Sequence, residues 1–236
     1  MIPEMRPRAS WAMAVAMGLA SVGTLPGKDT RESLRERLEK SGEPRILFVG
    51  NSYSFKIPGV LAQLARKEQR EMVVERVTKG GWTLQKHAGS EQTLARIREA
   101  RWDVVVLQEQ SQLPSFSREQ RGKQMIPHAK ILVEEIRTAG AVPVFFQTWG
   151  RRDGDRQNAG IFPDDTFSKM QARLVAGYRE AAKAAGGVLV VPVGEAWAKE
   201  MRAGKGRRLY AGDGSHPSTD GVRHSARIFY QFFFGE

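Results

Sequence analysis

The sequence predicts a three-layer α/β/α fold around a doubly wound, five-stranded parallel sheet. Five short apolar runs of strand length recur along the chain, and segments with the spacing of helices separate them. The chain of 236 residues is long enough for one domain with a full hydrophobic core. No internal repeat, low-complexity segment or interdomain linker interrupts the alternation.

The individual elements follow from these patterns in order. Strands are expected at 45–49, 72–77, 103–107, 142–146 and 188–192. Helices are expected at 28–40, 58–70, 91–100, 118–138, 166–185, 195–202 and 220–233. The first of these is charged, with only Leu34 and Leu38 apolar, and should lie on the surface. Pro127 should kink the long fourth helix, and Gly140 should end it.

The N-terminus has the features of a secretory signal. Arg6 and Arg8 precede an apolar run at 11–22, which small residues follow. This run is short for a membrane span and fits a signal core, with a frayed tail as the alternative. We therefore expect a signal peptide at 1–23, an extension with a surface helix at 24–43, a folded domain at 44–236, and a secreted or periplasmic protein.

Composition narrows the chemistry. The chain has no cysteine, which excludes disulfides, thiol nucleophiles and cysteine-bound metals. Its net charge of +11 is typical of nucleic-acid binding, but most basic residues are scattered beside acidic ones, so no nucleic-acid partner is expected. No cluster of His, Asp and Glu has metal-site spacing, so we expect no metal and no cofactor. No segment after the signal is apolar for long enough to span a membrane.

A serine and a distant Asp–His pair form the candidate catalytic site. Ser52 follows the apolar run 46–49 in a glycine-led turn, at the sheet edge where open α/β folds bind ligands. Asp213 lies three residues before His216 and can hold its imidazole in one tautomer while the other ring nitrogen faces a serine. Serine also caps helices in such turns, which is the simpler explanation of Ser52 alone. The combination predicts acyl transfer.

These segments resemble the SGNH (GDSL-like) hydrolase superfamily. Gly50-Asn51-Ser52 stands where the family has Gly-Asp-Ser, and Asp213-x-x-His216 matches its C-terminal block. The glycine pair in the segment 78–83 matches the second block, whereas the third block, Gly-x-Asn-Asp, is absent as written from the segment 104–111. The resemblance implies a flavodoxin-like SGNH hydrolase domain at 44–236.

The resemblance also implies the parts of an oxyanion hole. The backbone N–H groups of Ser52 and of Gly80 or Gly81 would bind the oxyanion. A glutamine would replace the family's asparagine as the side-chain donor. Gln108 is favoured because it lies directly at the strand end, and Gln110 is the alternative because alternation places both on one side.

The loop that follows the fourth expected strand contains three candidates for substrate binding. Trp149 would form an apolar or sugar-stacking wall, and Arg151 and Arg152 lie in a loop that should neighbour the site. We expect a serine esterase that acts through an acyl-enzyme. By resemblance alone, its substrate would be a small-molecule or carbohydrate ester, with a short acyl group on a carbohydrate or another small alcohol. The alternative is a catalytically degenerate module of the same fold that binds an acidic polysaccharide or nucleic acid.

Overall fold

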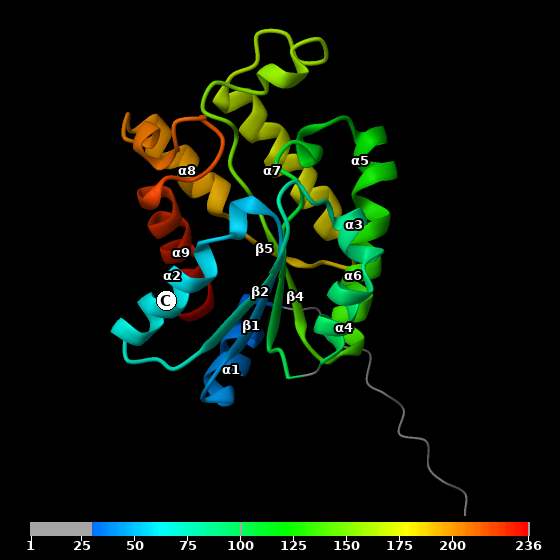
Figure 1. Cartoon of the computed structure of the whole chain (residues 1–236), viewed down its shortest axis with the longest axis vertical. Coiled ribbons are helices and arrows are strands. Elements are labelled where there is room, and N and C mark those ends of the chain that lie inside the picture. The colour runs from blue at the N-terminus through cyan, green and yellow to red at the C-terminus, as the bar shows by residue number, and fades with distance from the viewer. Residues whose placement is uncertain (1–29, 100, 236) are drawn as a thin grey trace, which may run out of the picture.

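The computed structural model of the protein describes residues 30–99 and 101–235. Its centre is a five-stranded sheet in the order β2-β1-β3-β4-β5 with every neighbouring pair parallel, which confirms the predicted fold class (Figure 1). The strands are β1 (Arg45–Gly50), β2 (Val73–Thr78), β3 (Val104–Leu107), β4 (Val142–Phe146) and β5 (Leu189–Val191).

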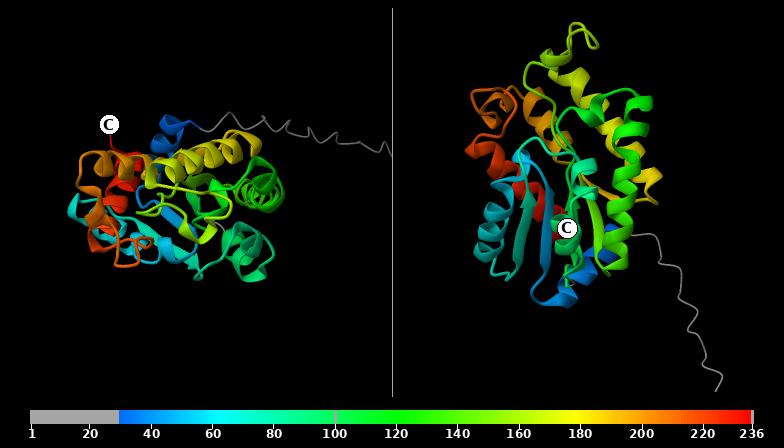
Figure 2. Two further views of the ribbon diagram at one scale, coloured as in Figure 1. Left: turned by 90° about the horizontal axis from the view of Figure 1, so that it is seen from above. Right: turned by 45° about the vertical axis from the view of Figure 1, so that its right-hand side comes forward.

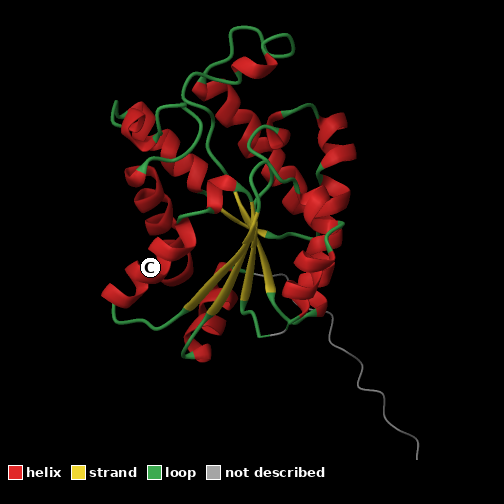
Figure 3. Cartoon of the chain, in the orientation of Figure 1, coloured by secondary structure: helices red, strands yellow, loops and turns green. Residues whose placement is uncertain are grey.

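Helices cover both faces of this sheet, as Figure 3 shows. One face packs against α1 (Arg31–Ser41), α2 (Ile57–Lys67), α8 (Val193–Arg202) and α9 (Thr219–Phe234). The other face packs against α3 (Leu84–Ala88), α4 (Glu91–Arg98), α6 (Ile126–Thr138) and α7 (Phe167–Ala184), with α5 (Arg118–Gln124) leading into α6. Alternation along the strands explains the two layers: in β3, Val104 and Val106 join the first core, and Val105 and Leu107 join the second.

The helix expected at 118–138 is two helices in the structure. It breaks at Met125, whose φ of −116° and ψ of −57° depart from helical values. Pro127 lies in the first turn of α6, a position where a missing N–H leaves no hydrogen bond unmade. Proline therefore starts a helix here instead of kinking one. The short α3 was not expected, because five residues are too few to show a helical period.

The described N-terminal segment packs onto the domain. Leu34 and Leu38 of α1 are buried in the core shared with α9. On the polar side of α1, Arg31 and Arg35 donate hydrogen bonds to the last-turn carbonyls of α9, at Gln231 and Phe232. The expected signal segment, residues 1–23, lies outside the described residues. Within the described part of the chain, no helix is both long enough and apolar enough to cross a bilayer.

The carboxyl ends of the strands carry long loops. The loop 147–166 after β4, yellow-green at the top of Figure 1, stands above this edge of the sheet. It meets the loop that leads into α9, because the N–H of Arg152 donates to the carbonyl of Gly214 at 2.8 Å. In the view from above in Figure 2, the yellow-green loop after β4 lies over the middle of the molecule. Open α/β sheets bind their ligands at this edge.

Candidate active site

Ser52 begins a 3-10 helix, η1 (Ser52–Ser54), directly after β1. Asn51 caps this helix, since its side-chain oxygen accepts a hydrogen bond from the backbone N–H two residues later at 3.2 Å. Gly50 has no room for a side chain, because a Cβ there would lie 2.7 Å from the amide oxygen of Gln108. The tight turn therefore lifts Ser52 out of the strand at the carboxyl edge of the sheet.

The structure brings Ser52, His216 and Asp213 together. The Oγ of Ser52 lies 2.9 Å from Nε2 of His216, and Nδ1 of His216 lies 2.6 Å from Oδ2 of Asp213. An ionised carboxylate can only accept hydrogen bonds, so Nδ1 carries the ring proton and Nε2 accepts from the serine. This is the arrangement that acyl transfer through a serine requires.

Asp213 is held in its ionised form. Burial acts to raise its pKa, but hydrogen bonds from His216 and from the backbone N–H groups of Ser215 and His216 outweigh burial and lower the pKa to about 2. The two backbone bonds to Oδ1 are each 2.9 Å long. They leave Oδ2 for the imidazole. Asp213 therefore both shapes the turn and orients the ring.

The turn around His216 is fastened to the loop after β4. Gly214 has a φ of +66°, which favours glycine, and a Cβ there would meet the guanidinium of Arg152 at 3.1 Å. Arg152 also pairs with Asp153 at 3.0 Å. Arg152, predicted to bind substrate, lies against this turn and outside the pocket that His216 lines.

A stack of aromatic rings lies beneath the catalytic turn. Tyr53, the residue after Ser52, stacks on Trp149 at 4.7 Å, and Trp149 stacks on Trp197 at 3.9 Å. The hydroxyl of Tyr53 lies 2.6 Å from Oγ of Ser215, and the indole N–H of Trp149 donates to the Ser215 carbonyl at 3.0 Å. The turn that carries Ser52 is thus tied to the turn that carries His216.

Trp149 is not the substrate-binding wall that the sequence suggested. Its side chain is fully buried, with 0% of its surface exposed. Its rings are covered on both faces by Tyr53 and Trp197, so no face remains for a sugar or an acyl chain. The position after a strand was predicted correctly, but the ring turns into the core and supports Ser215.

Gln108 does not direct its amide into the cleft as predicted. The side chain is fully buried, and its Oε1 accepts hydrogen bonds at 3.0 Å from the backbone N–H of Asn51 and from the hydroxyl of Ser54. Its Nε2 donates to the carbonyl of Glu109. The extra methylene of glutamine lets this amide reach back under the nucleophile turn. Gln108 therefore holds the turn from below.

Gln110, the alternative donor, is half-buried and folds over its own loop. Its Oε1 accepts from the N–H groups of Gln112 and Leu113, at 2.8 and 3.2 Å. Its Nε2 donates to the side chain of Gln112 at 3.1 Å. One of its two amide hydrogens is thus engaged, and the other has no partner among the described residues.

The glycine pair of the second block lies beside the nucleophile turn. Trp82 N–H bonds to the carbonyl of Lys79 at 3.2 Å, and Gly81 has the positive φ, +69°, that the third position of a type II turn requires. Asn51 Nδ2 donates to the carbonyl of Trp82 at 3.0 Å and joins the two loops. The backbone N–H groups of Gly80, Gly81 and Ser52 have no acceptor within the described chain.

Two buried ionisable residues support this region, and sequence reasoning gave neither a role. His87 donates from Nε2 to the carbonyl of Gly50 at 2.8 Å, and burial lowers its pKa to about 4, so it is neutral. Glu109 accepts from the N–H of Leu84 at 3.1 Å and of Gln110 at 2.6 Å, and burial raises its pKa to about 7. His87 steadies the nucleophile turn, and Glu109 ties the start of α3 to the loop after β3.

A pocket of about 310 Å³ opens beside His216. The turn at 213–216 forms one wall. The opposite wall comes from the loop after β4, with Arg151, Asp153, Gly154, Arg156 and Gln157. Arg151 therefore lies beside the candidate site as predicted, and Arg156 is a lining residue that the sequence analysis did not single out.

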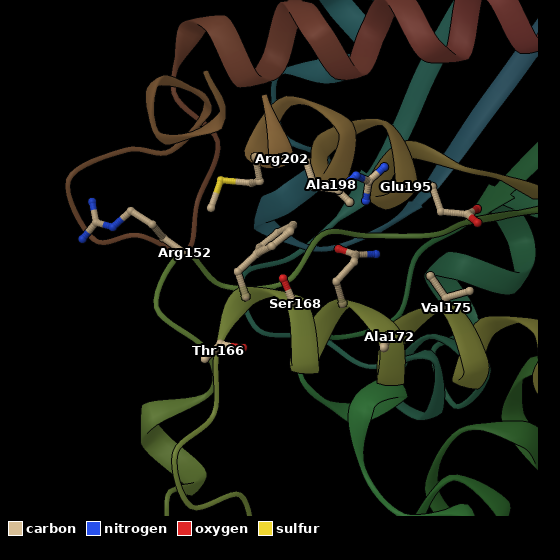
Figure 4. Close-up of a pocket in the computed structure, with 11 residues that line it drawn as sticks. Arg152, Thr166, Ser168, Ala172, Val175, Glu195, Ala198 and Arg202 are labelled. Atoms are coloured by element: carbon tan, nitrogen blue, oxygen red, sulfur yellow. The ribbon is translucent and has the colours of Figure 1, made fainter. Parts of the chain in front are cut away.

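A second cavity, of about 480 Å³, lies between α7 and α8. Figure 4 shows that side chains of the two helices face each other across it, among them Ala172 and Val175 of α7 and Ala198 of α8. None of the candidate catalytic residues lines it. In the described part of the chain, no group of three or more His, Asp or Glu side chains converges as a metal site would.

The sequence matches no protein-family model and no curated protein sequence. Solved structures do match. A DUF4886 family protein from Bacteroides uniformis has a TM-score of 0.70 at 19% identity, over 82% of this chain and 84% of that one. Axe2, an acetylxylan esterase from Geobacillus stearothermophilus, has a TM-score of 0.61 at 16% identity, over 81% and 95% of the two chains.

A lipase/acylhydrolase from Enterococcus faecalis has a TM-score of 0.53 at 16% identity, over 80% of this chain and 95% of that one. These esterases and lipases share one architecture, the SGNH hydrolase fold. The chain has the SGNH hydrolase fold. At these identities the likeness shows the fold alone.

Proposed function

We propose that this protein is a serine esterase that hydrolyses its substrate through an acyl-enzyme. The observation that carries the proposal is the chain of two hydrogen bonds from Ser52 through His216 to Asp213, at 2.9 and 2.6 Å. Ser52 and the distant Asp213–His216 pair meet at the edge of the sheet where such folds bind ligands. A serine hydroxyl hydrogen-bonded to an imidazole that a carboxylate orients is an activated nucleophile.

In the first half-reaction, Ser52 Oγ attacks the ester carbonyl and His216 Nε2 takes the hydroxyl proton. Asp213 stabilises the imidazolium that forms. The oxyanion accepts hydrogen bonds from the N–H of Ser52 and of Gly80 or Gly81, which the Asn51 bridge to Trp82 keeps beside the nucleophile. His216 then protonates the leaving alkoxide as the tetrahedral intermediate collapses. A water molecule then attacks the acyl carbonyl while His216 takes its proton, and His216 returns that proton to Ser52 Oγ as the carboxylic acid leaves.

The buried position of Gln108 changes the predicted oxyanion hole. Two backbone N–H groups would carry most of the stabilisation. The unengaged amide hydrogen of Gln110 is the remaining side-chain candidate. In this proposal Gln108 is a positioning residue that acts through the turn carrying Ser52.

The substrate we propose is an ester of a short acyl group with a carbohydrate or another small alcohol. An acetylxylan esterase among the structural neighbours supports this choice. The site is also open, since the side chain of His216 is 45% exposed and that of Asp213 is 49% exposed. An open site beside a small pocket suits a short acyl group on a soluble alcohol. A long acyl chain would need a deeper apolar channel.

A panel of p-nitrophenyl esters from acetate to octanoate tests the esterase function. Ser52→Ala and His216→Ala should each reduce kcat by about 10⁴-fold or more, and the double variant should be little worse than either. Ser168→Ala, an exposed serine on α7, is the control and should keep wild-type turnover. Equal turnover by wild type and Ser52→Ala would refute the mechanism and favour a binding module of the same fold.

We also propose that the protein is exported. Arg6, Arg8 and the apolar run 11–22, which lie outside the described residues, carry this proposal. When the full chain is expressed in a bacterium, the mature protein should begin near residue 24 in an intact-mass measurement. Cytoplasmic protein that still begins at Met1 would contradict it.

A further inference from the structure

We propose that the pocket beside His216 receives the alcohol part of the ester and that Arg151 and Arg156 select an alcohol with a carboxylate group. The inference rests on the proposed esterase function, because it assigns a place to the leaving group. The two guanidinium groups indicate a substrate whose alcohol part is an anion.

The sheet order places the leaving group. β1, which ends at Ser52, has β2 on one side and β3, then β4, on the other. The turn with Gly80 and Gly81 follows β2, and the loop 147–166 follows β4, so the two lie on opposite sides of the nucleophile. A carbonyl oxygen in the oxyanion hole points toward the β2 side. The base must reach the leaving oxygen, so the leaving alcohol lies next to His216, which lines the pocket on the β4 side.

The guanidinium group of Arg151 has N–H donors that make no hydrogen bond within the described residues. Its side chain is 16% exposed, and its one ion-pair contact is to Oδ1 of Asp155 at 3.6 Å, longer than a hydrogen bond. Its Nε is buried without a partner, and none of its guanidinium N–H groups hydrogen-bonds to a described residue. A charged group that is largely buried with unmade hydrogen bonds is costly, and a bound anion would satisfy them.

Arg156 lines the pocket, and the residue before it is anchored by buried hydrogen bonds. It begins a short 3-10 helix, η3 (Arg156–Asn158), next to Asp155, which is fully buried. Asp155 accepts hydrogen bonds from Gln112 at 2.7 Å and from Asn158 at 2.8 Å. Its N–H donates to Asp165, which pairs with Arg173 at 2.7 Å. The exposed Arg156 itself has no acidic partner within 4 Å in the described chain.

The two acidic residues that line the pocket are paired with groups other than Arg151 and Arg156. Asp213 is hydrogen-bonded to His216, and Asp153 pairs with Arg152. A planar guanidinium can donate two parallel hydrogen bonds to a carboxylate. It binds a neutral amide or hydroxyl less strongly. The pocket of about 310 Å³ has room for a small carboxylated alcohol.

Two matched pairs of esters test the inference. 3-Acetoxybenzoate and 3-acetoxybenzamide share an acetyl group and differ in the charge of the leaving phenol. Monophenyl succinate and phenyl succinamate place the same difference in the acyl part. The ratio of kcat/KM within each pair is compared among wild type, Arg156→Gln, Arg151→Lys and Arg66→Gln. Arg66→Gln, on the exposed end of α2, is the control for net charge.

Wild type should prefer 3-acetoxybenzoate over its amide, mainly through a lower KM. Arg156→Gln should reduce the ratio about 10-fold, as expected for a lost charged hydrogen bond, and Arg151→Lys should reduce it in part. Arg66→Gln should keep the wild-type ratio. Equal ratios in Arg156→Gln and Arg66→Gln would overturn the inference. So would an Arg156-dependent preference confined to the succinate pair, because the pocket would then hold the acyl part.

Direct binding separates this inference from the esterase proposal. Titration calorimetry with 3-hydroxybenzoate should give binding to Ser52→Ala protein and about 10-fold weaker binding to Ser52→Ala/Arg156→Gln. If no ester shows Ser52-dependent hydrolysis, the esterase function fails, whereas Arg156-dependent binding would still support the anion site. Binding that is absent, or equal in the two proteins, would overturn the site itself.

Discussion

Replacing Gln108 with methionine tests whether this side chain supports the nucleophile turn. Its amide makes three buried hydrogen bonds, with the N–H of Asn51, the hydroxyl of Ser54 and the carbonyl of Glu109. Methionine has a similar volume, so little cavity forms, but all three groups lose their partner. At about 1 kcal/mol for each unsatisfied group, the free energy of unfolding should fall by about 3 kcal/mol.

Urea denaturation followed by tryptophan fluorescence measures this loss, and p-nitrophenyl acetate turnover measures its effect on the nucleophile. Ser54→Ala is the matched control, because it removes one donor and leaves the bond from Gln108 to Asn51 in place. Ser54→Ala should lower the free energy of unfolding by about 1 kcal/mol. Turnover by Gln108→Met should fall together with stability, since the turn that carries Ser52 loses its support.

The opposite pattern would refute this reasoning. If Gln108→Met keeps wild-type stability and its kcat falls 10²- to 10³-fold, as is typical for a lost oxyanion donor, the amide acts on the substrate in solution. The side chain would then have to leave its buried position before the reaction.

Three further predictions concern the neighbouring residues. Asn51→Asp restores the Gly-Asp-Ser motif but turns a carboxylate toward the carbonyl of Trp82, so kcat for p-nitrophenyl acetate should fall about 10-fold; unchanged kcat would count against the bridge. Tyr53→Phe and Ser215→Ala each break the 2.6 Å bond between the two catalytic turns, so each should lower kcat more than it changes KM, and the double variant should be no worse; additive losses would contradict this coupling. Burial raises the pKa of Glu109 from 4.5 to about 7, so the folded state binds this proton more tightly and stability should fall as pH rises through that range; Glu109→Gln should flatten the decline in urea midpoints between those two pH values, and equal slopes would contradict it.

Much of the fold could be predicted because burial on both faces leaves a strong signal. The runs that became β1, β3 and β4 are nearly continuous in apolar residues, which is typical of central parallel strands. The break at Met125 was harder to predict, since helix continues on both sides of it and only the backbone angles at this residue depart from helical values. A proline inside such a pattern can kink a helix or begin one, and the sequence favoured the wrong choice.

At the site, the sequence indicated positions better than directions. Ser52, Asp213 and His216 lie on short turns whose backbone fixes where the side chains point, and they meet. Gln108 and Trp149 also lie at the predicted edge, but both turn inward because a long amide and a large ring find buried partners there. Those partners are remote in sequence, so no local pattern reveals the choice.

The covalent reactivity of Ser52 tests the central claim most directly. A fluorophosphonate probe should label wild-type protein once, and peptide mapping should place the label on Ser52. His216→Ala should label far more slowly, because the hydroxyl loses the base that lies 2.9 Å away. A label on another serine, or equal labelling rates in wild type and His216→Ala, would contradict the proposed mechanism.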